Sequence, residues 1–224
     1  CVDINTENQE VATFLTNSYM EYVNMGVDAF RLDTEKHINR WTLNSAYFPV
    51  FNKVDNFYIF GEVCARVRDV WNHNIPSSSP PFFTWAETES QWKNNWSTTD
   101  WESNYENAYA HYDAHNNTQN VETSDNAFLK GNNYHTPDYS KSNGTGVIDF
   151  SMHWNFDSAQ EAYRAGLAED RYINDSTWNV MYVDSHDYGP DSSQTTRFNS
   201  GTQAWAENLN LIFTFRGIPC LYYG

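Results

Sequence analysis

Residues 8–37, NQEVATFLTNSYMEYVNMGVDAFRLDTEKH, decide the fold, because a helical pattern changes to a strand pattern across a single glycine. Apolar residues in the first half recur at i, i+3, i+4, i+8, i+11 and i+12, which is one face of an amphipathic helix: Val11, Phe14, Leu15, Tyr19, Tyr22 and Val23. Gly26 stands where a helix C-terminus favours glycine. Directly after it, residues 27–33, VDAFRLD, form a short run that predicts a buried strand. The order helix, glycine, strand is typical of an α/β fold with parallel strands.

The same alternation continues along the chain. We predict helices over residues 8–25, 46–54, 158–169 and 202–216, and strands over residues 27–33, 56–63, 147–150, 178–183 and 218–223. Thr6 or Asn5 is expected to cap the first helix, and Gly217 is expected to end the last one.

Charge and composition exclude several classes of protein. The 224 residues include 13 Lys and Arg against 29 Asp and Glu, a formal net charge of −16, so neither nucleic acid nor an anionic membrane surface is an expected partner. Aromatic residues make up 17% of the chain, which is too many large apolar side chains for a disordered acidic tail. No stretch approaches the roughly 20 apolar residues of a membrane span. We therefore expect a globular protein without a membrane span.

The alternation of helix and strand breaks between the second and third predicted strands. A Ser/Pro-rich loop at residues 76–81 is followed by closely spaced tryptophans: Trp85, Trp92, Trp96 and Trp101. Because connections inside βα units are short, we interpret residues 65–145 as a long insertion with a small structure of its own. Its aromatic side chains either form the core of that insertion, which is the interpretation we favour, or stack on sugar rings.

Three acidic residues share one context, the carboxyl end of a predicted strand. Asp33 ends the first strand, Glu62 lies near the end of the second, and Asp187 follows the fourth. In a (β/α) barrel these strand ends converge on one face, which holds the active site. A single Asp at a strand end is most often solvated or caps a helix. Three acids in register, with Arg31 and two histidines beside them, favour a catalytic site instead.

The neighbours of these acids suggest different tasks for them. Arg31 lies two residues before Asp33, so both side chains point to the same side of a strand. A guanidinium in that place keeps a carboxylate ionised and oriented, as a nucleophile requires. Glu62 lies on a predicted strand rich in aromatic residues, where burial favours the protonated form that a general acid needs.

Several segments, in order along the chain, resemble the motifs of the α-amylase family of glycoside hydrolases. GVDAFRLDTEKH at 26–37 is similar to G-x-x-x-F-R-x-D-x-x-K-H, and YVDSHD at 182–187 is similar to F-V-x-N-H-D. FGEV at 60–63 resembles the strand of the acid/base, GIPCLYYG at 217–224 the last barrel strand, and VDIN at 2–5 a segment of the small second domain. Each motif alone is weak, but the ordered set is specific.

The resemblance implies a role for each matching residue. Asp33 would be the nucleophile, and Glu62 would be the general acid/base. Asp187 would be the third carboxylate, which binds the distorted sugar and stabilises the transition state. Arg31 would orient Asp33, and His186 would form a hydrogen bond with the sugar in the cleavage subsite.

The resemblance also implies contacts farther from the scissile bond. Lys36 and His37 would border the leaving-group side of the site. The main-chain carbonyl of His37 would bind a structural calcium ion (Ca2+), with Asp3 as a further candidate ligand.

The chain departs from the family motifs at two places. Ser185 replaces the usual Asn of N-H-D, and Cys64-Ala65 stand where many members carry an Asp after the acid/base segment. Neither departure touches the three carboxylates.

The Lys36-His37 pair points to enzymes that act on α-1,4-glucans. We expect a retaining α-amylase, which cleaves internal α-1,4-glucosidic bonds of starch, glycogen or maltooligosaccharides by double displacement. An α-1,4-glucan glycosyltransferase such as a cyclodextrin-forming enzyme is the alternative, and a non-catalytic glucan-binding relative is a weaker one. The composition and the substrate suggest a secreted or cell-surface protein that is a monomer at full length.

The fold class implied by the resemblance is a (β/α)8 TIM barrel. Residues 1–224 would cover roughly strands 4 to 8 of this catalytic domain, with the 65–145 insertion after strand 5. A closed barrel has eight strands, so we expect residues 1–224 alone to expose sheet edges, to fold poorly and to be inactive.

Overall fold

The computed structural model describes residues 4–6, 8–38, 42–64, 83–84, 142–170, 175–190 and 196–223. Within them, five short parallel strands follow one another in chain order: β1 (Ala29–Leu32), β2 (Tyr58–Gly61), β3 (Thr145–Val147), β4 (Val180–Met181) and β5 (Ile218–Pro219). The first three form one sheet and the last two another, and a parallel bridge between Ile148 and Val180 joins the two. The five predicted parallel strands are therefore confirmed. Almost all of the predicted insertion, including its four tryptophans, lies outside the described residues.

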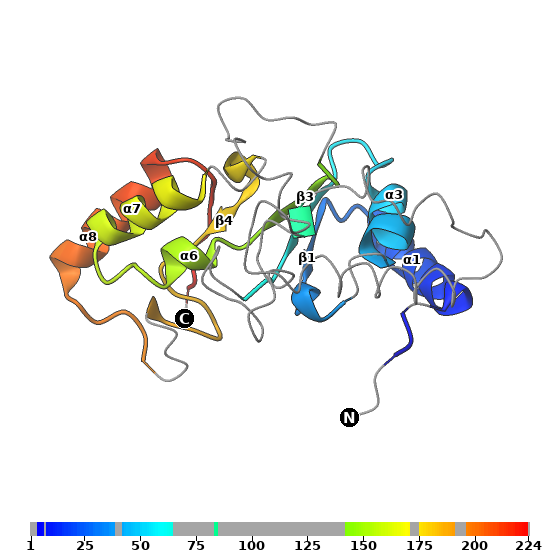
Figure 1. Ribbon diagram of the computed structural model, residues 1–224, viewed down its shortest axis with the longest axis horizontal. Helices are drawn as coiled ribbons and strands as arrows, with labels where there is room; N and C mark the ends of the chain where they lie inside the picture. Colours follow the sequence, from blue (N-terminus) through cyan, green and yellow to red (C-terminus); the bar gives the residue numbers. More distant parts are fainter. Residues whose placement is uncertain are drawn as a thin grey trace, which may run out of the picture.

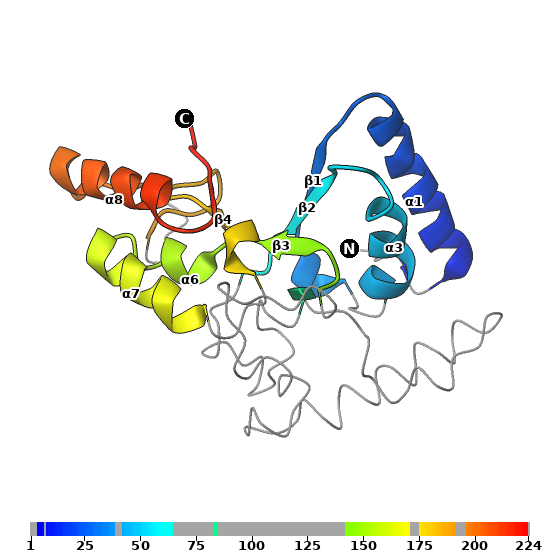
Figure 2. The ribbon, with the colours of Figure 1, turned by 90° about the horizontal axis from the view of Figure 1, so that it is seen from above.

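Helices flank this row of strands in two groups (Figures 1 and 2). The first group, near β1 and β2, comprises α1 (Gln9–Asn24), the π-helical turn η2 (Leu43–Tyr47) and α3 (Phe48–Phe51). The second, near β4 and β5, comprises α6 (Phe150–His153), α7 (Ala159–Glu169) and α8 (Thr202–Thr214). Two 3-10 turns, η1 (Glu35–His37) and η7 (Ser176–Trp178), follow β1 and precede β4. No described helix is both long and apolar enough to cross a membrane.

Alternate residues of the strands face opposite sides, as a pleated backbone requires. Along β2 and just beyond it, Ile59 and Val63 pack into a core with the first group of helices. Tyr58 and Phe60 face the other side, where they pack with residues of β4 and β5. Glu62 continues this second set, so its carboxyl lies on the side opposite to the first group of helices.

The first helix is capped by a different residue from the two that were predicted. Asn8, rather than Thr6 or Asn5, is the N-cap, because its Oδ1 accepts hydrogen bonds from two free backbone N–H groups of the first turn, at 2.9 and 3.2 Å. The other end agrees with the sequence: Gly26 adopts a positive φ of 97° and closes the helix.

Two other predicted elements are displaced for local reasons. The helix expected over residues 46–54 starts earlier, as η2, and continues as α3 only to Phe51. Pro49 lacks the N–H that would continue a regular α-helical ladder through this segment. The strand expected over residues 147–150 ends early because Asp149 caps α6, its Oδ1 accepting from a backbone N–H at 3.0 Å.

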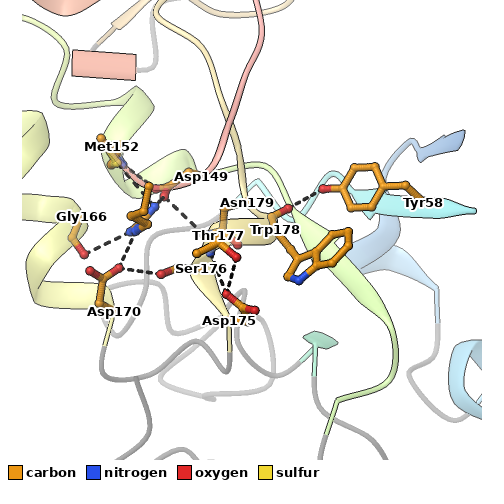
Figure 3. A network of polar contacts seen from close by, with 11 residues as sticks. Tyr58, Asp149, Met152, Gly166, Asp170, Asp175, Ser176, Thr177, Trp178 and Asn179 are labelled. Atoms are coloured by element: carbon orange, nitrogen blue, oxygen red, sulfur yellow. Dashed lines mark hydrogen bonds and ion pairs between the residues drawn. The ribbon is translucent and has the colours of Figure 1, made fainter. Parts of the chain in front are cut away.

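A buried polar network connects the ends of α7 and α8 to the residue after the Ile148 bridge (Figure 3). Arg216, beyond the end of α8, donates from Nη1 to Asp149 Oδ2 and from Nε to Asp170 Oδ1, both at 2.5 Å. Its Nη2 donates to the carbonyl of Gly166 at 3.1 Å, and Ser176 Oγ donates to Asp170 at 2.8 Å. One guanidinium therefore holds two buried carboxylates and joins three elements.

Candidate active site

Arg31 is the centre of a cluster at the carboxyl ends of β1 and β2. Its Nη1 lies 2.5 Å from Asp33 Oδ1, and its Nη2 lies 3.4 Å from Glu62 Oε2. Burial acts to lower the pKa of Arg31, but the hydrogen bond that Arg31 donates to Asp33 and the charges of Glu62 and Asp33 outweigh it, so the pKa is raised. One guanidinium thus holds two of the predicted carboxylates side by side.

The turn after β1 supplies a second donor to Glu62. Thr34 adopts a left-handed conformation, with φ 50° and ψ 35°, which is uncommon and strained for a β-branched residue. This conformation allows the Thr34 backbone N–H to donate to Glu62 Oε2 at 3.1 Å. Sequence reasoning missed this contact, because a backbone donor leaves no residue pattern.

The two acids held by Arg31 differ in their contact with solvent. The Asp33 side chain is 66% exposed, whereas the Glu62 side chain is 9% exposed. An open carboxylate is accessible to an incoming reactive carbon, and a shielded carboxyl can deliver a proton without competition from bulk water. The pair therefore has the asymmetry that a nucleophile and a general acid need.

Lys36 connects η1 to the segment that follows Glu62. Its Nζ donates to the carbonyl of Cys64 at 3.1 Å. His37 is exposed, and within the described ranges no hydrogen bond or ion pair joins its side chain to Arg31, Asp33 or Glu62. Of the two residues predicted to border the leaving group, the structure therefore brings Lys36 alone into the cluster.

The calcium ligands stay a prediction. The described part of the chain contains no group of three or more His, Cys, Asp or Glu side chains placed to hold a metal ion. Asp3 lies outside that part, so His37 is the one predicted ligand that the structure shows. These residues do not make a calcium site by themselves, and we assign no chemical step to calcium.

Asp187 and His186 lie on the turn after β4. His186 Nε2 lies 2.9 Å from Asp187 Oδ2, and Arg197 Nη2 donates to the carbonyl of His186 at 2.8 Å. Burial raises the pKa of the Cys64 thiol, and the charges of both Glu62 and Asp187 add to that effect. The charge of Asp187, on the turn after β4, therefore acts on Cys64, which lies two residues after Glu62.

Two tyrosines beside the cluster were not predicted. Burial raises the pKa of Tyr182, and the charge of Glu62 acts in the same direction while that of Arg31 opposes it. The hydroxyl of Tyr188 forms a hydrogen bond with the Cys64 thiol. Tyr182 could have been found from the alternation along β4, but Tyr188 lies on a turn, where no period indicates the direction of a side chain.

Comparisons with known proteins agree with this geometry. The chain matches the model of the α-amylase catalytic domain over residues 1–224. Solved structures with a similar fold include CldA, described as a cyclomaltodextrin glucanotransferase with a three-domain ABC distribution, with a TM-score of 0.56 and 17% identity. Others are an Anoxybacillus α-amylase (TM-score 0.53, 18% identity) and the α-amylase GTA from Geobacillus thermoleovorans, solved with acarbose (TM-score 0.51, 15% identity). No curated protein matches the chain.

These matches differ in how much of each chain they cover. The alignments include 99% of this chain but 33%, 37% and 38% of the CldA, Anoxybacillus and Geobacillus chains, so it spans little more than a third of their length. At these identities the solved structures show the fold, and the family follows from the match to its model. That match covers the whole sequence, and the chain therefore belongs to the α-amylase family, within its (β/α)8-barrel catalytic domain.

Proposed function

We propose that the protein is a retaining glycoside hydrolase that cleaves internal α-1,4-glucosidic bonds of starch, glycogen or maltooligosaccharides, which is the activity of an α-amylase. One observation carries the proposal: Arg31 joins the exposed Asp33 and the buried Glu62 at the carboxyl ends of adjacent parallel strands. We also propose that the five strands correspond to strands 4 to 8 of the family barrel, with residues 65–145 inserted after strand 5.

The first chemical step in this proposal uses both acids of the cluster. Asp33 attacks the anomeric carbon while Glu62 donates a proton to the glycosidic oxygen, so the bond to the leaving sugar breaks as the bond to Asp33 forms. Arg31 orients the Asp33 carboxylate for this attack. In this proposal Lys36, whose Nζ donates to the carbonyl of Cys64 beyond Glu62, borders the leaving sugar.

The second step reverses the roles. Glu62, now a carboxylate, takes a proton from water, and the oxygen of that water attacks the anomeric carbon and releases Asp33. Two inversions at one carbon give net retention. In this proposal Asp187 and His186, whose side chains are exposed, bind the distorted sugar in both steps.

The alternative activity is glycosyl transfer. It differs in the second step alone, since a sugar hydroxyl then replaces water as the acceptor. Structural calcium, secretion or display at the cell surface, and a monomeric state at full length also stay proposals.

The test uses the natural full-length protein with starch as substrate. Asp33→Asn and Glu62→Gln should each lower kcat/KM by at least about a thousandfold, because each removes a group that forms or breaks a bond in the reaction. Asp55→Asn, on the exposed loop after α3, is the matched control and should keep wild-type activity. Wild-type activity of either site variant would overturn the proposal.

Product analysis separates hydrolysis from transfer. Short linear maltooligosaccharides released in the α configuration are expected. If cyclic or disproportionated glucans dominate, the enzyme is a transferase.

A further inference from the structure

We propose that Ser185 is a positioning residue for Asp187: its hydroxyl group holds the turn that presents Asp187 and His186 to the substrate. The inference rests on the proposed role of Asp187 in glycoside cleavage. It concerns a position where this chain departs from the N-H-D motif, so the motif itself gives Ser185 no role.

The contacts of Ser185 close the turn. Its Oγ accepts hydrogen bonds from the backbone N–H groups of Asp187 at 3.2 Å and Tyr188 at 2.9 Å. The carbonyl of Tyr188 accepts in return from Ser185 N at 3.0 Å and from Ser185 Oγ at 3.2 Å. A hydroxyl that bonds to backbone N–H groups two and three residues later is the geometry of a serine turn.

Burial makes this hydroxyl the natural anchor of the turn. Ser185 is 6% exposed, whereas the side chains of His186 and Asp187 are exposed and contact each other. The position of the Asp187 carboxylate therefore depends on its backbone, and one of the bonds that fix this backbone ends on Ser185 Oγ. Without Oγ, two backbone N–H groups would lose their acceptor and the turn could relax.

The residues around the turn extend this anchor to the rest of the site. The Ser185 hydroxyl contacts the side chain of Tyr182, and Tyr188 reaches the Cys64 thiol two residues beyond Glu62. On its other side the turn is held by Arg197, which donates to the carbonyl of His186 and stacks over the Tyr222 ring at 5.7 Å. Ser185 thus holds the buried side of a turn that carries Asp187 and contacts the segment after Glu62.

The same geometry explains how serine can replace asparagine here. An Asn side chain also accepts hydrogen bonds from backbone N–H groups two or three residues later, through its amide oxygen. An acceptor oxygen, rather than a particular residue type, is what the turn requires. Ser185→Ala should therefore lose the positioning of Asp187, and Ser185→Asn should restore it.

The experiment measures kcat and KM on maltoheptaose with the full-length protein. Ser185→Ala should lower kcat by about 10- to 100-fold, the range expected when a reacting group is misplaced by about 1 Å, with a smaller change in KM. Ser185→Asn should recover most of the loss, and Ser200→Ala, an exposed serine elsewhere, is the matched control. A Ser185→Ala enzyme with kcat within twofold of the wild type would overturn the inference.

A double-mutant cycle with Asp187→Asn separates positioning from a general loss of structure. If Ser185 acts through Asp187, then Ser185→Ala should have little further effect on kcat in the Asp187→Asn background. Equal effects in both backgrounds would reject the role. If Ser185→Ala does not fold, Ser185→Cys replaces it, because a thiol of similar size is a weak acceptor. Folded Ser185→Cys should lose at least about fivefold in kcat, and unchanged kcat would reject the role.

The outcomes also distinguish this inference from the proposed function. Full activity of Asp187→Asn would show that Asp187 has no role in cleavage, and the inference about Ser185 would then be rejected as well. Loss of activity in Asp187→Asn together with an unaffected Ser185→Ala would reject the inference alone.

Discussion

Glu35 follows the proposed nucleophile by two residues and fills the space that a side chain at Gly61 would occupy. A Cβ added to Gly61 would lie 1.2 Å from Glu35 Oε2 and 2.9 Å from Glu35 Cβ, and Glu35 is fully buried. Gly61 directly precedes Glu62, so this contact sets the spacing between the turn that carries Asp33 and the strand that carries the acid/base.

Gly61→Ala should therefore destabilise the full-length protein by about 1–3 kcal/mol through overpacking. The same change in a Glu35→Ala background should cost much less, because the competing side chain is gone. Urea unfolding of the four proteins gives the coupling free energy directly. If Gly61→Ala costs the same free energy of unfolding in both backgrounds, the proposed contact is wrong.

His153 makes the stability of the molecule sensitive to acid. Burial lowers the pKa of this histidine from 6.5 to about 4, against the smaller opposing effects of the Tyr182 and Val183 carbonyls and the Asp149 charge. In the unfolded chain this histidine binds a proton below about pH 6.5, whereas in the folded protein it stays neutral down to about pH 4. The stability associated with neutral His153 is complete above pH 6.5 and is lost as the pH falls toward 4.

The loss should reach about 3 kcal/mol across this window. His153→Gln, which does not titrate, should remove this part of the acid dependence. Urea unfolding at several values between pH 7 and pH 4 measures the difference between the two proteins. Parallel curves of unfolding free energy against pH would contradict the assignment.

At the scale of elements, Arg216 joins α7, α8 and the end of the β3 segment. Arg216→Met should destabilise the protein by about 3–5 kcal/mol, because it leaves Asp149 and Asp170 buried without their cation. Arg164→Met, on the exposed side of α7, removes a charge of the same type without a buried partner and should change stability by less than about 0.5 kcal/mol. Thermal unfolding measures the stability of the two variants. Equal losses of stability would show that the buried network contributes no more than an exposed charge.

The elements also show what the sequence could and could not predict. The five strands and the helices that contain α1, α7 and α8 were predictable, because periodicity and glycine positions are local signals. The pairing of Arg31 with Asp33 was predictable for a similar reason, since side chains two residues apart on a strand point to the same side. The Arg216 network was not, because its partners lie 46 and 67 residues away and no local pattern pairs them. The early end of the third strand was missed because the cap at Asp149 outweighed the apolar run around it.

At the scale of the whole molecule, the two ends of the row of strands carry exposed apolar surface. Within the described residues, β1 pairs with β2 alone and β5 pairs with β4 alone. In the first group of helices, Phe14 on α1 is 69% exposed and Met25 at its end is 77% exposed; Phe213 on α8 and Leu221 after β5 are exposed as well. Unpaired strand edges and apolar patches of this kind favour association with other chains.

We therefore expect residues 1–224 produced alone to behave differently from the full-length protein. The isolated chain should self-associate, bind a hydrophobic dye and unfold without a sharp transition, because strand edges and apolar side chains that a closed barrel would cover face solvent. It should not cleave starch, since the candidate site lies at the ends of β1 and β2, and within the described residues β1 has one unpaired edge. Sedimentation, calorimetry and a starch assay on both proteins measure these properties. A monomeric chain 1–224 that melts cooperatively and cleaves starch would show that these five strands form a stable active unit without further strands.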